Sequence, residues 1–237
     1  MGILYVVPTP VGNLEDITYR ALKVLKEADL ILAEDTRTSA NLLRHYEIHN
    51  RLESYHKFNE HGKVEKVVEH LKAGENIALI SDAGTPGISD PGYLVVREAV
   101  RAGVEVQCLP GATAFVPALV ASAIPCDHFR FEGFLPQKKG RATRIASLKD
   151  EKMTTIFYES PYRVMRTLQA FAETLGGNRM VAVCREISKV HEEIYRGTLT
   201  DALAHFNIFE PRGEFVIILA GSETEDIFPL DEEDDAE

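Results

Sequence analysis

The regular alternation of short β-branched runs with longer amphipathic stretches constrains this chain more than any other feature. Residues 3–7, 30–33 and 77–80 are apolar runs of strand length, and each is followed, after a loop, by a stretch with helical periodicity. Such alternation is typical of α/β proteins, in which consecutive strands lie parallel and helices cover the sheet. The sequence therefore predicts an α/β fold whose first sheet is largely parallel.

A change in this pattern divides the chain into two predicted domains. An Ala-rich helix expected at 114–123 ends at Ile124-Pro125-Cys126-Asp127, and its proline favours a linker. Beyond the linker the order of strands and helices changes, and the strands expected on either side of Ser188-Lys189 can form a hairpin. We expect an N-terminal α/β domain at 1–123 and a C-terminal α/β domain with a mixed sheet at 128–221.

Acidic residues are concentrated at the C-terminus. Nine of the 37 Asp and Glu residues lie between Glu223 and Glu237, where there is no basic residue. Without them the net charge of −11 falls to nearly zero, so the rest of the chain can still carry a basic face for an anionic partner. We expect residues 222–237 to form a solvated, disordered acidic tail.

Apolar runs and cysteine spacing indicate the compartment. No apolar run approaches the length of a membrane span. Cys108, Cys126 and Cys184 lie far apart without a Cys-x-x-Cys pair, which disfavours disulfides and zinc, and the histidines lack His-x-x-x-His spacing. We expect a cytoplasmic protein with no metal site and no membrane partner.

Three predicted strands of the first domain end in loops rich in glycine, proline and small polar residues. These loops are residues 8–13, 81–91 and 110–114. Ligands bind beyond the carboxyl ends of parallel strands, and glycine lets a backbone come close to a ligand, so the three loops together predict a binding cleft. Taken singly, each loop is explained equally well as a set of turns.

The first of these loops indicates which ligands are disfavoured. A dinucleotide site requires Gly-x-Gly-x-x-Gly at the start of a helix, so that backbone amides meet a pyrophosphate. Pro8 and Pro10 remove amide donors at those positions, and no Walker lysine motif occurs in the chain. NAD- or ATP-dependent chemistry is therefore disfavoured, and a nucleoside ligand without phosphate, such as S-adenosylmethionine, fits better.

Charged clusters also follow predicted strands. They are Glu34-Asp35-Thr36-Arg37 in the first domain, and Glu159-Ser160-Pro161-Tyr162-Arg163 and Arg185-Glu186-Ile187-Ser188-Lys189 in the second. Their position at strand ends favours a functional role. Helix capping and surface ion pairs are the alternative explanation of each cluster.

A compact basic patch begins a predicted helix of the second domain. Its members are Lys138, Lys139, Arg141 and Arg144, and it lies beside the apolar Phe134-Leu135. Such a patch can contact the phosphates of RNA. A solvated helix start explains it equally well.

Four specific segments occur in order along the chain, namely 6–18, Glu34-Asp35-Thr36-Arg37, 81–86 and Arg185-Glu186-Ile187-Ser188-Lys189. This ordered set resembles the tetrapyrrole (corrin/porphyrin) methylase superfamily and, within it, enzymes that methylate small-subunit ribosomal RNA; the resemblance runs from Ile3 to about Gly221. It implies two α/β domains with S-adenosylmethionine in the interdomain cleft, usually in a homodimer. It also implies 2′-O-methylation of a cytidine ribose in the decoding region, with small-subunit ribosomal RNA or the 30S subunit as partner.

The resemblance further implies which residues contact the cofactor. They lie at loop and strand ends and are Val11, Asp82, Gly84, Thr85, Ile88, Thr113, Ala114, Phe157 and Tyr158. The usual Gly-Asp-Pro-Gly of the superfamily is here Gly84-Thr85-Pro86-Gly87, so the acidic contact can come from Asp82 instead.

A ribose hydroxyl is a weak nucleophile at neutral pH and benefits from a nearby base or hydrogen-bond acceptor. Glu186 and Lys189 are the leading candidates for this catalytic role, with Glu34, Asp35 and Arg37 as alternatives. Two other functions stay open: a tetrapyrrole methylase of the same fold, and a non-catalytic ribosome-binding module. The basic patch weighs against the first, and uptake of S-adenosylmethionine distinguishes an enzyme from the second.

Overall fold

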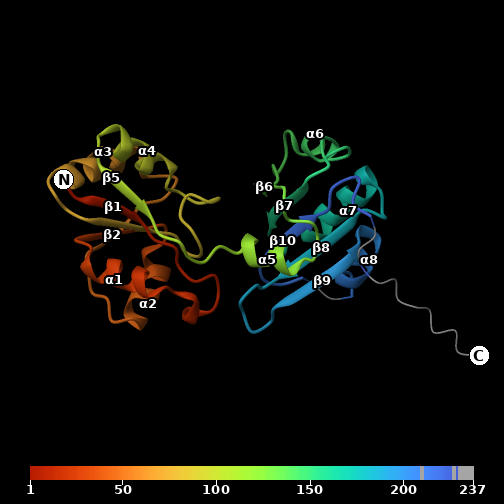
Figure 1. The fold of residues 1–237 in the computed structure, drawn as a ribbon, viewed down its shortest axis with the longest axis horizontal. Helices are drawn as coiled ribbons and strands as arrows, with labels where there is room; N and C mark the ends of the chain where they lie inside the picture. The colour runs from red at the N-terminus through yellow and green to blue at the C-terminus, as the bar shows by residue number, and fades with distance from the viewer. Residues whose placement is uncertain (209–210, 226–227, 229–237) are drawn as a thin grey trace, which may run out of the picture. The chain divides into compact units, whose positions relative to one another are not determined.

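The computed structural model describes residues 1–208, 211–225 and 228. Contacts within the chain divide it into two units, Met1–Thr113 and Ala114–Glu237 (Figure 1). None of the described helices is long and apolar enough to cross a lipid bilayer.

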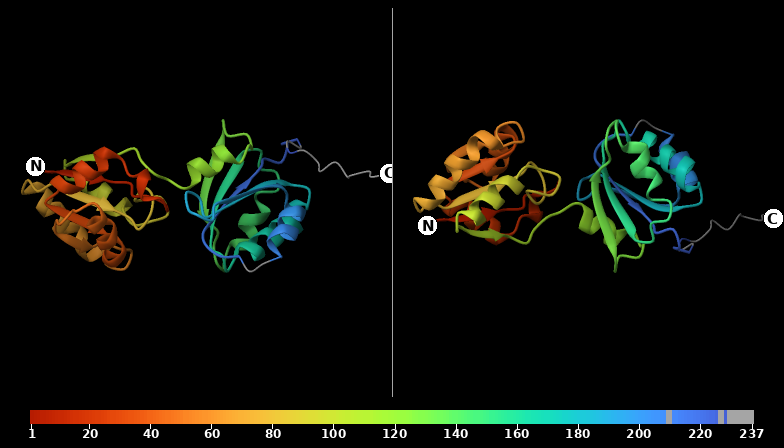
Figure 2. Two further views of the ribbon diagram at one scale, coloured as in Figure 1. Left: turned by 90° about the horizontal axis from the view of Figure 1, so that it is seen from below. Right: turned by 90° about the horizontal axis from the view of Figure 1, so that it is seen from above.

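The first unit is a parallel five-stranded sheet with helices on both faces (Figure 2). Its strands are β1 (Ile3–Val6), β2 (Leu30–Ala33), β3 (Leu52–Ser54), β4 (Ile77–Ile80) and β5 (Glu105–Cys108), in the spatial order β3-β2-β4-β1-β5. A short 3-10 helix, η1 (Leu14–Asp16), precedes the helices α1 (Tyr19–Glu27), α2 (Thr36–His45), α3 (Glu60–Lys72) and α4 (Tyr93–Arg101). The largely parallel sheet predicted for this part of the chain is confirmed.

Strand β2 shows why both faces must be covered. All four of its residues are buried, and successive side chains of a strand point to opposite faces. Leu30 and Leu32 join the core under α3 and α4, whereas Ile31 and Ala33 join the core under α1 and α2. The sheet is therefore the middle layer of a three-layer unit.

The second unit has a mixed sheet, as predicted. Its strands are β6 (Phe129–Phe134), β7 (Thr154–Glu159), β8 (Met180–Arg185), β9 (Glu193–Thr198) and β10 (Phe215–Leu219), in the order β6-β7-β10-β8-β9. Only β6 and β7 run parallel; the other pairs are antiparallel. Helices α6 (Arg141–Ala146), α7 (Val164–Leu175) and α8 (Leu199–Phe206) cover one face, and α5 (Phe115–Ala121) packs on the other.

Helix α5 changes the predicted domain boundary. Ala118 and Leu119 of this helix are buried among β7, β8 and β10, and the carbonyl oxygen of Ala118 accepts a hydrogen bond from Cys184 Sγ at 3.8 Å. The helix therefore belongs to the second unit, and the boundary lies between Thr113 and Ala114 rather than after residue 123.

Two other differences from the sequence predictions have local causes. The helical periodicity that follows residues 30–33 predicts a helix across Ser39–Tyr46, but helix α2 already begins at Thr36, because Asp35 caps it. Helix α8 was not expected; Thr198 caps it, and Leu199, Ala202 and Phe206 are buried on its inner face.

The predicted acidic tail falls mostly outside the described residues. Within it, Ser222 donates a backbone hydrogen bond to the Glu151 carbonyl oxygen at 2.7 Å, and Glu223 pairs with Lys152 at 2.7 Å. Residues 226–227 and 229–237 lie outside the described part of the chain.

Candidate functional site

The strand order places the three Gly/Pro loops side by side. Strand β1 lies between β4 and β5, and their carboxyl ends open on the same edge of the parallel sheet. Thr9 and Gly84 exchange two backbone hydrogen bonds of 2.9 Å, and the Thr9 hydroxyl donates to the Ser81 carbonyl oxygen at 3.1 Å. The first and second loops are therefore joined beyond the ends of their strands.

The third loop is held to the other two by side chains. The Thr85 hydroxyl donates to the Ala112 carbonyl oxygen at 3.0 Å and lies 2.7 Å from the Thr113 hydroxyl. A Cβ atom on Gly111 would lie 2.7 Å from Pro8 Cβ, so the residue at position 111 must be glycine for the loops to come this close. The three loops form one cradle.

Gly84 is the centre of this cradle. Its φ of +80° is a conformation that side chains other than glycine adopt only with strain. A Cβ atom there would lie 3.5 Å from Val11 Cγ1 and 3.8 Å from the Ala112 carbonyl oxygen. The structure thus brings together Val11, Gly84, Thr85 and Thr113, four of the predicted cofactor residues.

Of the three other predicted residues of these loops, Ile88 and Asp82 lie at the rim, whereas Ala114 belongs to the second unit. Ile88 is exposed and donates its backbone amide to the Thr85 carbonyl oxygen at 3.2 Å. Asp82 is exposed, and its Oδ1 accepts the Asp35 amide at 3.1 Å. Thr85 and Asp82 are the alternatives for the polar contact to the cofactor. The Thr85 hydroxyl already contacts the third loop, whereas Asp82 is exposed and can meet a ligand.

Carboxylates give this edge of the sheet a negative charge. Burial, with the charges of Glu34 and Asp82, raises the pKa of Asp90 to about 7. Burial and the charge of Asp82 raise the pKa of Glu34, and burial raises that of Asp82. Among the salt bridges of the described chain, none involves these three carboxylates. The excess of negative charge suits a cationic ligand.

Asp90 was not singled out from the sequence. It lies in the second Gly/Pro loop, directly before Pro91 and directly after Ser89, whose φ of +67° is unusual for a residue with a side chain. Its position in a Gly/Pro loop was the sequence signal that could have marked it as a candidate site residue. Its pKa depends on burial and on Glu34, which is 56 positions away, and these could not be inferred from the loop alone.

Asp35 and Arg37 serve the start of α2. Asp35 Oδ1 accepts the Arg37 amide at 2.8 Å, and Asp35 Oδ2 pairs with the Arg37 guanidinium at 2.7 Å. These bonds lower the pKa of Asp35 to about 2. The pair therefore acts as a helix cap, while the neighbouring Glu34 belongs with Asp82 and Asp90.

Glu186 and Lys189 lie together in the second unit, between β8 and β9. Lys189 Nζ is 2.7 Å from Glu186 Oε1 and 2.9 Å from Glu214 Oε2, and the Glu214 amide donates to Glu186 Oε1 at 3.0 Å. A Cβ atom on Gly213 would overlap the Glu186 carboxyl group, which therefore packs closely on this backbone.

The hydrogen bonds of this pair decide its protonation. Burial opposes ionisation of Glu186, but the bonds from Lys189 and from the Glu214 amide outweigh it and lower the pKa of Glu186. Burial also disfavours the charge on Lys189, but its two carboxylate partners raise its pKa. Both groups remain ionised near neutral pH, an arrangement better suited to positioning than to accepting a proton.

The predicted contacts of the second unit divide between two faces of its sheet. Phe157 is 1% exposed and packs on Phe171 with ring centroids 5.2 Å apart. Tyr158 points to the opposite face, where its ring centroid lies 5.1 Å from that of Phe131 and its side chain packs in the same core cluster as Ala114. The side chains of Phe157 and Tyr158 therefore cannot both contact one ligand.

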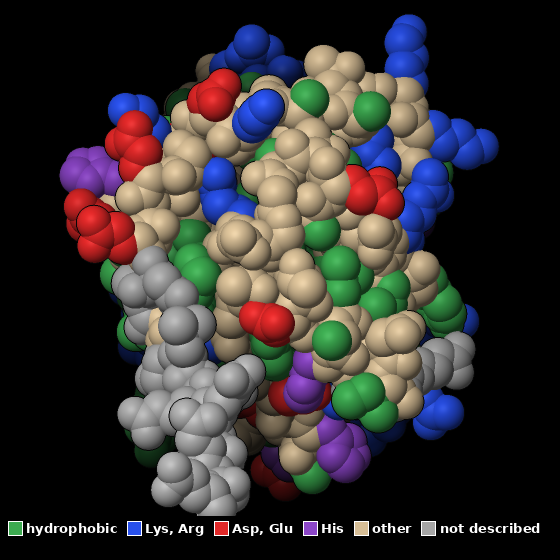
Figure 3. Space-filling view, turned by 90° about the vertical axis from the view of Figure 1, so that its right-hand side faces the viewer, with side chains coloured by type: hydrophobic (Ala, Val, Ile, Leu, Met, Phe, Trp, Pro, Cys, Tyr) green, Lys and Arg blue, Asp and Glu red, His purple; other side chains and the backbone are tan. Residues whose placement is uncertain are grey.

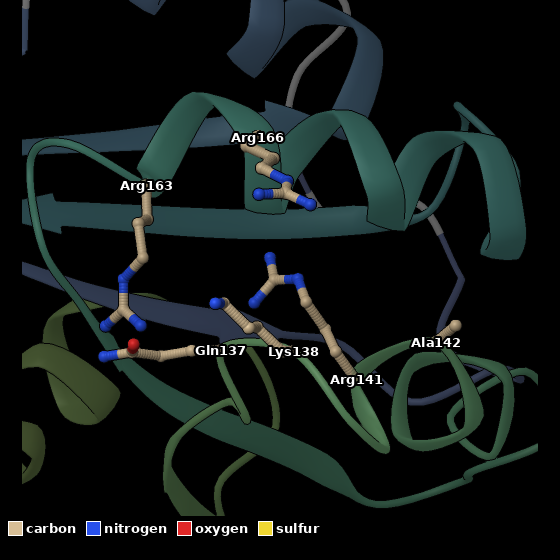
Figure 4. Close-up of a pocket in the computed structure, with 6 residues that line it drawn as sticks. All are labelled: Gln137, Lys138, Arg141, Ala142, Arg163 and Arg166. Atoms are coloured by element: carbon tan, nitrogen blue, oxygen red, sulfur yellow. The ribbon is translucent and has the colours of Figure 1, made fainter.

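The structure also divides the predicted basic patch. Lys138 and Arg141 line a pocket of the second unit, together with Arg163, the N-cap residue of α7, and Arg166 within α7 (Figure 4). Arg144 Nε instead donates to Glu132 Oε2 at 2.7 Å, and Lys139 is exposed outside the pocket lining. Lys and Arg side chains gather along the upper right edge of the face seen in Figure 3.

Residues 3–203 match the family model of tetrapyrrole (corrin/porphyrin) methylases. The chain is 48% identical over 95% of its length to "Ribosomal RNA small subunit methyltransferase I" of Synechocystis, covering 81% of that protein. It is 46% identical to the protein of the same name from Thermotoga maritima, covering 94% of this chain and 100% of that one.

Solved structures show the same fold at low identity. The methyltransferase CobJ has a TM-score of 0.68 at 20% identity, with 96% of this chain and 98% of that chain covered. Uroporphyrin-III-C-methyltransferase from Thermus thermophilus has a TM-score of 0.65 at 18% identity, with 94% and 95% covered.

Proposed function

The chain belongs to the tetrapyrrole (corrin/porphyrin) methylase family, and on this premise we propose that it methylates small-subunit ribosomal RNA. The observation that carries the proposal is the 46–48% identity, over more than nine-tenths of the chain, to proteins named for this activity. The finer proposal is transfer of a methyl group to the 2′-oxygen of a cytidine ribose in the decoding region. We further propose that the chain acts as a homodimer in the cytoplasm.

S-adenosylmethionine is the methyl donor of this family. When bound, its sulfonium supplies an electrophilic methyl group. The cradle fits such a ligand in two respects: Gly84 leaves backbone groups without a side chain in the way, and the carboxylates of Glu34, Asp82 and Asp90 favour a cation. Val11, Gly84, Thr85 and Thr113 would surround it, with Asp82 and Ile88 at the rim.

In the finer proposal, the residues of this chain align a ribose hydroxyl and take up its proton. A general base works best when its pKa lies near the operating pH. The Asp90 carboxylate, with a pKa of about 7, meets this condition, and Glu34 beside it has a raised pKa as well. Glu186 and Lys189, which remain an ion pair, would position substrate groups instead.

Methyl transfer to under-methylated small subunits tests the function directly. Radiolabelled donor is incubated with these subunits, and the modified nucleotide is mapped by mass spectrometry of nuclease digests. We expect one 2′-O-methylated cytidine in the decoding region. Label on a base instead of a ribose would refute the finer proposal, and transfer to a tetrapyrrole with none to RNA would refute the broader one.

The oligomeric state is tested separately by light scattering during size-exclusion chromatography. A mass twice the 26.4 kDa of one chain is the expected result. A mass of a single chain at working concentrations, with full methyl transfer, would refute the dimer without affecting the proposed activity.

A further inference from the structure

A pocket of about 690 Å³ in the second unit gathers four cations from two segments. Lys138 and Arg141 come from the start of α6 and the turn before it, and Arg163 and Arg166 come from the start of α7. In Figure 4 the nitrogen ends of these side chains point into the same space. Like charges brought this close repel one another unless an anion lies among them.

A buried hydrogen-bond chain holds two of these arginines in place. Arg141 is 7% exposed, and its guanidinium donates to the Thr167 hydroxyl at 2.7 Å. That hydroxyl donates to Glu159 Oε2 at 2.7 Å, while Glu159 Oε1 pairs with the Arg163 guanidinium at 2.9 Å. Glu159 is itself 3% exposed, so this frame is part of the packed interior and not a mobile surface contact.

The charges of the pocket are not balanced by the protein. Within the described chain, Glu159 is the one carboxylate paired with any of the four cations, and it pairs with Arg163. Burial lowers the pKa of Arg141; the charge of Glu159 opposes this shift in part, and the charges of Arg166 and Arg163 add to it. Arg163 Nη1 is a buried donor with no hydrogen-bond partner in the described structure. A buried charged donor without an acceptor is costly, so Arg163 adds to the uncompensated positive charge around the pocket. Four cations with one paired carboxylate favour an anion in the pocket.

We propose that this pocket binds a backbone phosphate of the RNA substrate, an inference that rests on the proposed function. Guanidinium groups match phosphate oxygens in pairs, and the pocket offers three of them with one ammonium. Aromatic rings flank it: Arg163 lies 5.9 Å from the centre of the half-exposed Phe134 ring, and the neighbouring Tyr162 is 93% exposed. Exposed aromatic rings beside cations are typical of single-stranded RNA sites, where bases stack, and they favour RNA over an acidic peptide.

RNA binding by a charge variant tests this inference. The full chain is titrated into a fluorescein-labelled RNA fragment of the decoding region, and anisotropy is followed between 50 and 200 mM salt, roughly the range in which phosphate contacts dominate. Arg166→Gln, an exposed position, should weaken binding on the order of tenfold and reduce the slope of log K against log salt by about 0.7–0.9. Arg166→Lys should keep the slope. Lys149→Gln, an exposed charge outside the pocket, is the matched control and should leave both unchanged.

Neutral linkages in the RNA locate the phosphate. Methylphosphonate replaces each phosphate of the fragment in turn, and one position is expected to weaken wild-type binding while leaving Arg166→Gln unaffected. If no position does so, or if Arg166→Gln binds RNA like the wild type, the pocket does not hold an RNA phosphate. This failure differs from failure of the proposed function, in which the wild type itself transfers no methyl group to small subunits. Unchanged affinity of the variant for S-adenosylmethionine, by calorimetry, shows that it is folded.

Discussion

Replacing Asp90 by asparagine should stabilise the first unit and reduce activity at the same time. Burial, with Glu34 and Asp82 nearby, raises the Asp90 pKa from 3.8 to about 7. A shift of this size corresponds to about 4 kcal/mol, and because the side chain is only partly buried we expect about 2 kcal/mol after screening by water. Asn keeps the shape of the carboxyl group but cannot ionise.

The sign of this effect follows from proton linkage. Between pH 4 and pH 7, roughly, the folded protein binds a proton at Asp90 that the unfolded chain releases, so Asp90 lowers stability progressively as pH rises through this range. Above pH 7 or so the penalty is complete. The advantage of Asp90→Asn should therefore be near zero at about pH 4 and about 2 kcal/mol at about pH 8.

Urea unfolding followed by circular dichroism at several pH values measures this difference. Asp150→Asn, at an exposed position of the second unit, is the control for the change of a carboxylate to an amide. A stability difference between Asp90→Asn and the wild type that is the same at every pH would refute the argument. In methyl transfer at pH 7.5 or so, Asp90→Asn should be slower by about 10²-fold if Asp90 takes up the hydroxyl proton. Full activity of this variant would show that Asp90 affects stability but does not take up the hydroxyl proton.

Three further predictions concern the loops and the ion pair. Thr85→Val removes two hydroxyl contacts to the third loop, so it should lower the free energy of unfolding by about 1–2 kcal/mol. It should also weaken S-adenosylmethionine binding in calorimetry. Unchanged affinity would show that this hydroxyl is not needed to shape the cradle. Gly84→Ala places a side chain at φ +80°, so it should lower the free energy of unfolding by about 1–3 kcal/mol and weaken cofactor binding. Gly74→Ala, at φ +104° with open space around it, is the control and should lose stability without losing cofactor affinity. Lys189→Met should raise the pKa of Glu186, because it removes the ammonium group that stabilises the carboxylate. The stability that Glu186 contributes is lost as pH falls through its folded pKa, so acid unfolding between about pH 2 and 5 should shift to higher pH in this variant. An acid unfolding curve identical to that of the wild type would contradict the role of this pair.

The first sheet illustrates what periodicity alone can predict. The bounds of β2 and β4 agree with their apolar runs residue for residue, because an apolar strand between two helical layers is buried at every position. The spatial order β3-β2-β4-β1-β5 depends on how these strands pair, and pairing leaves no local pattern in the chain. That order is what places the three predicted loops next to one another.

The candidate site shows the same division. The sequence by itself determined the α/β class, the Gly/Pro loops and, through the resemblance, most residues of the cradle, because glycine at a positive φ and proline at a turn act within a few residues. Only the tertiary structure decided that Arg166 joins Lys138, that Arg144 turns to Glu132, and that burial raises the pKa of Asp90. These properties depend on neighbours far away in the chain, which packing brings together and which no local pattern records.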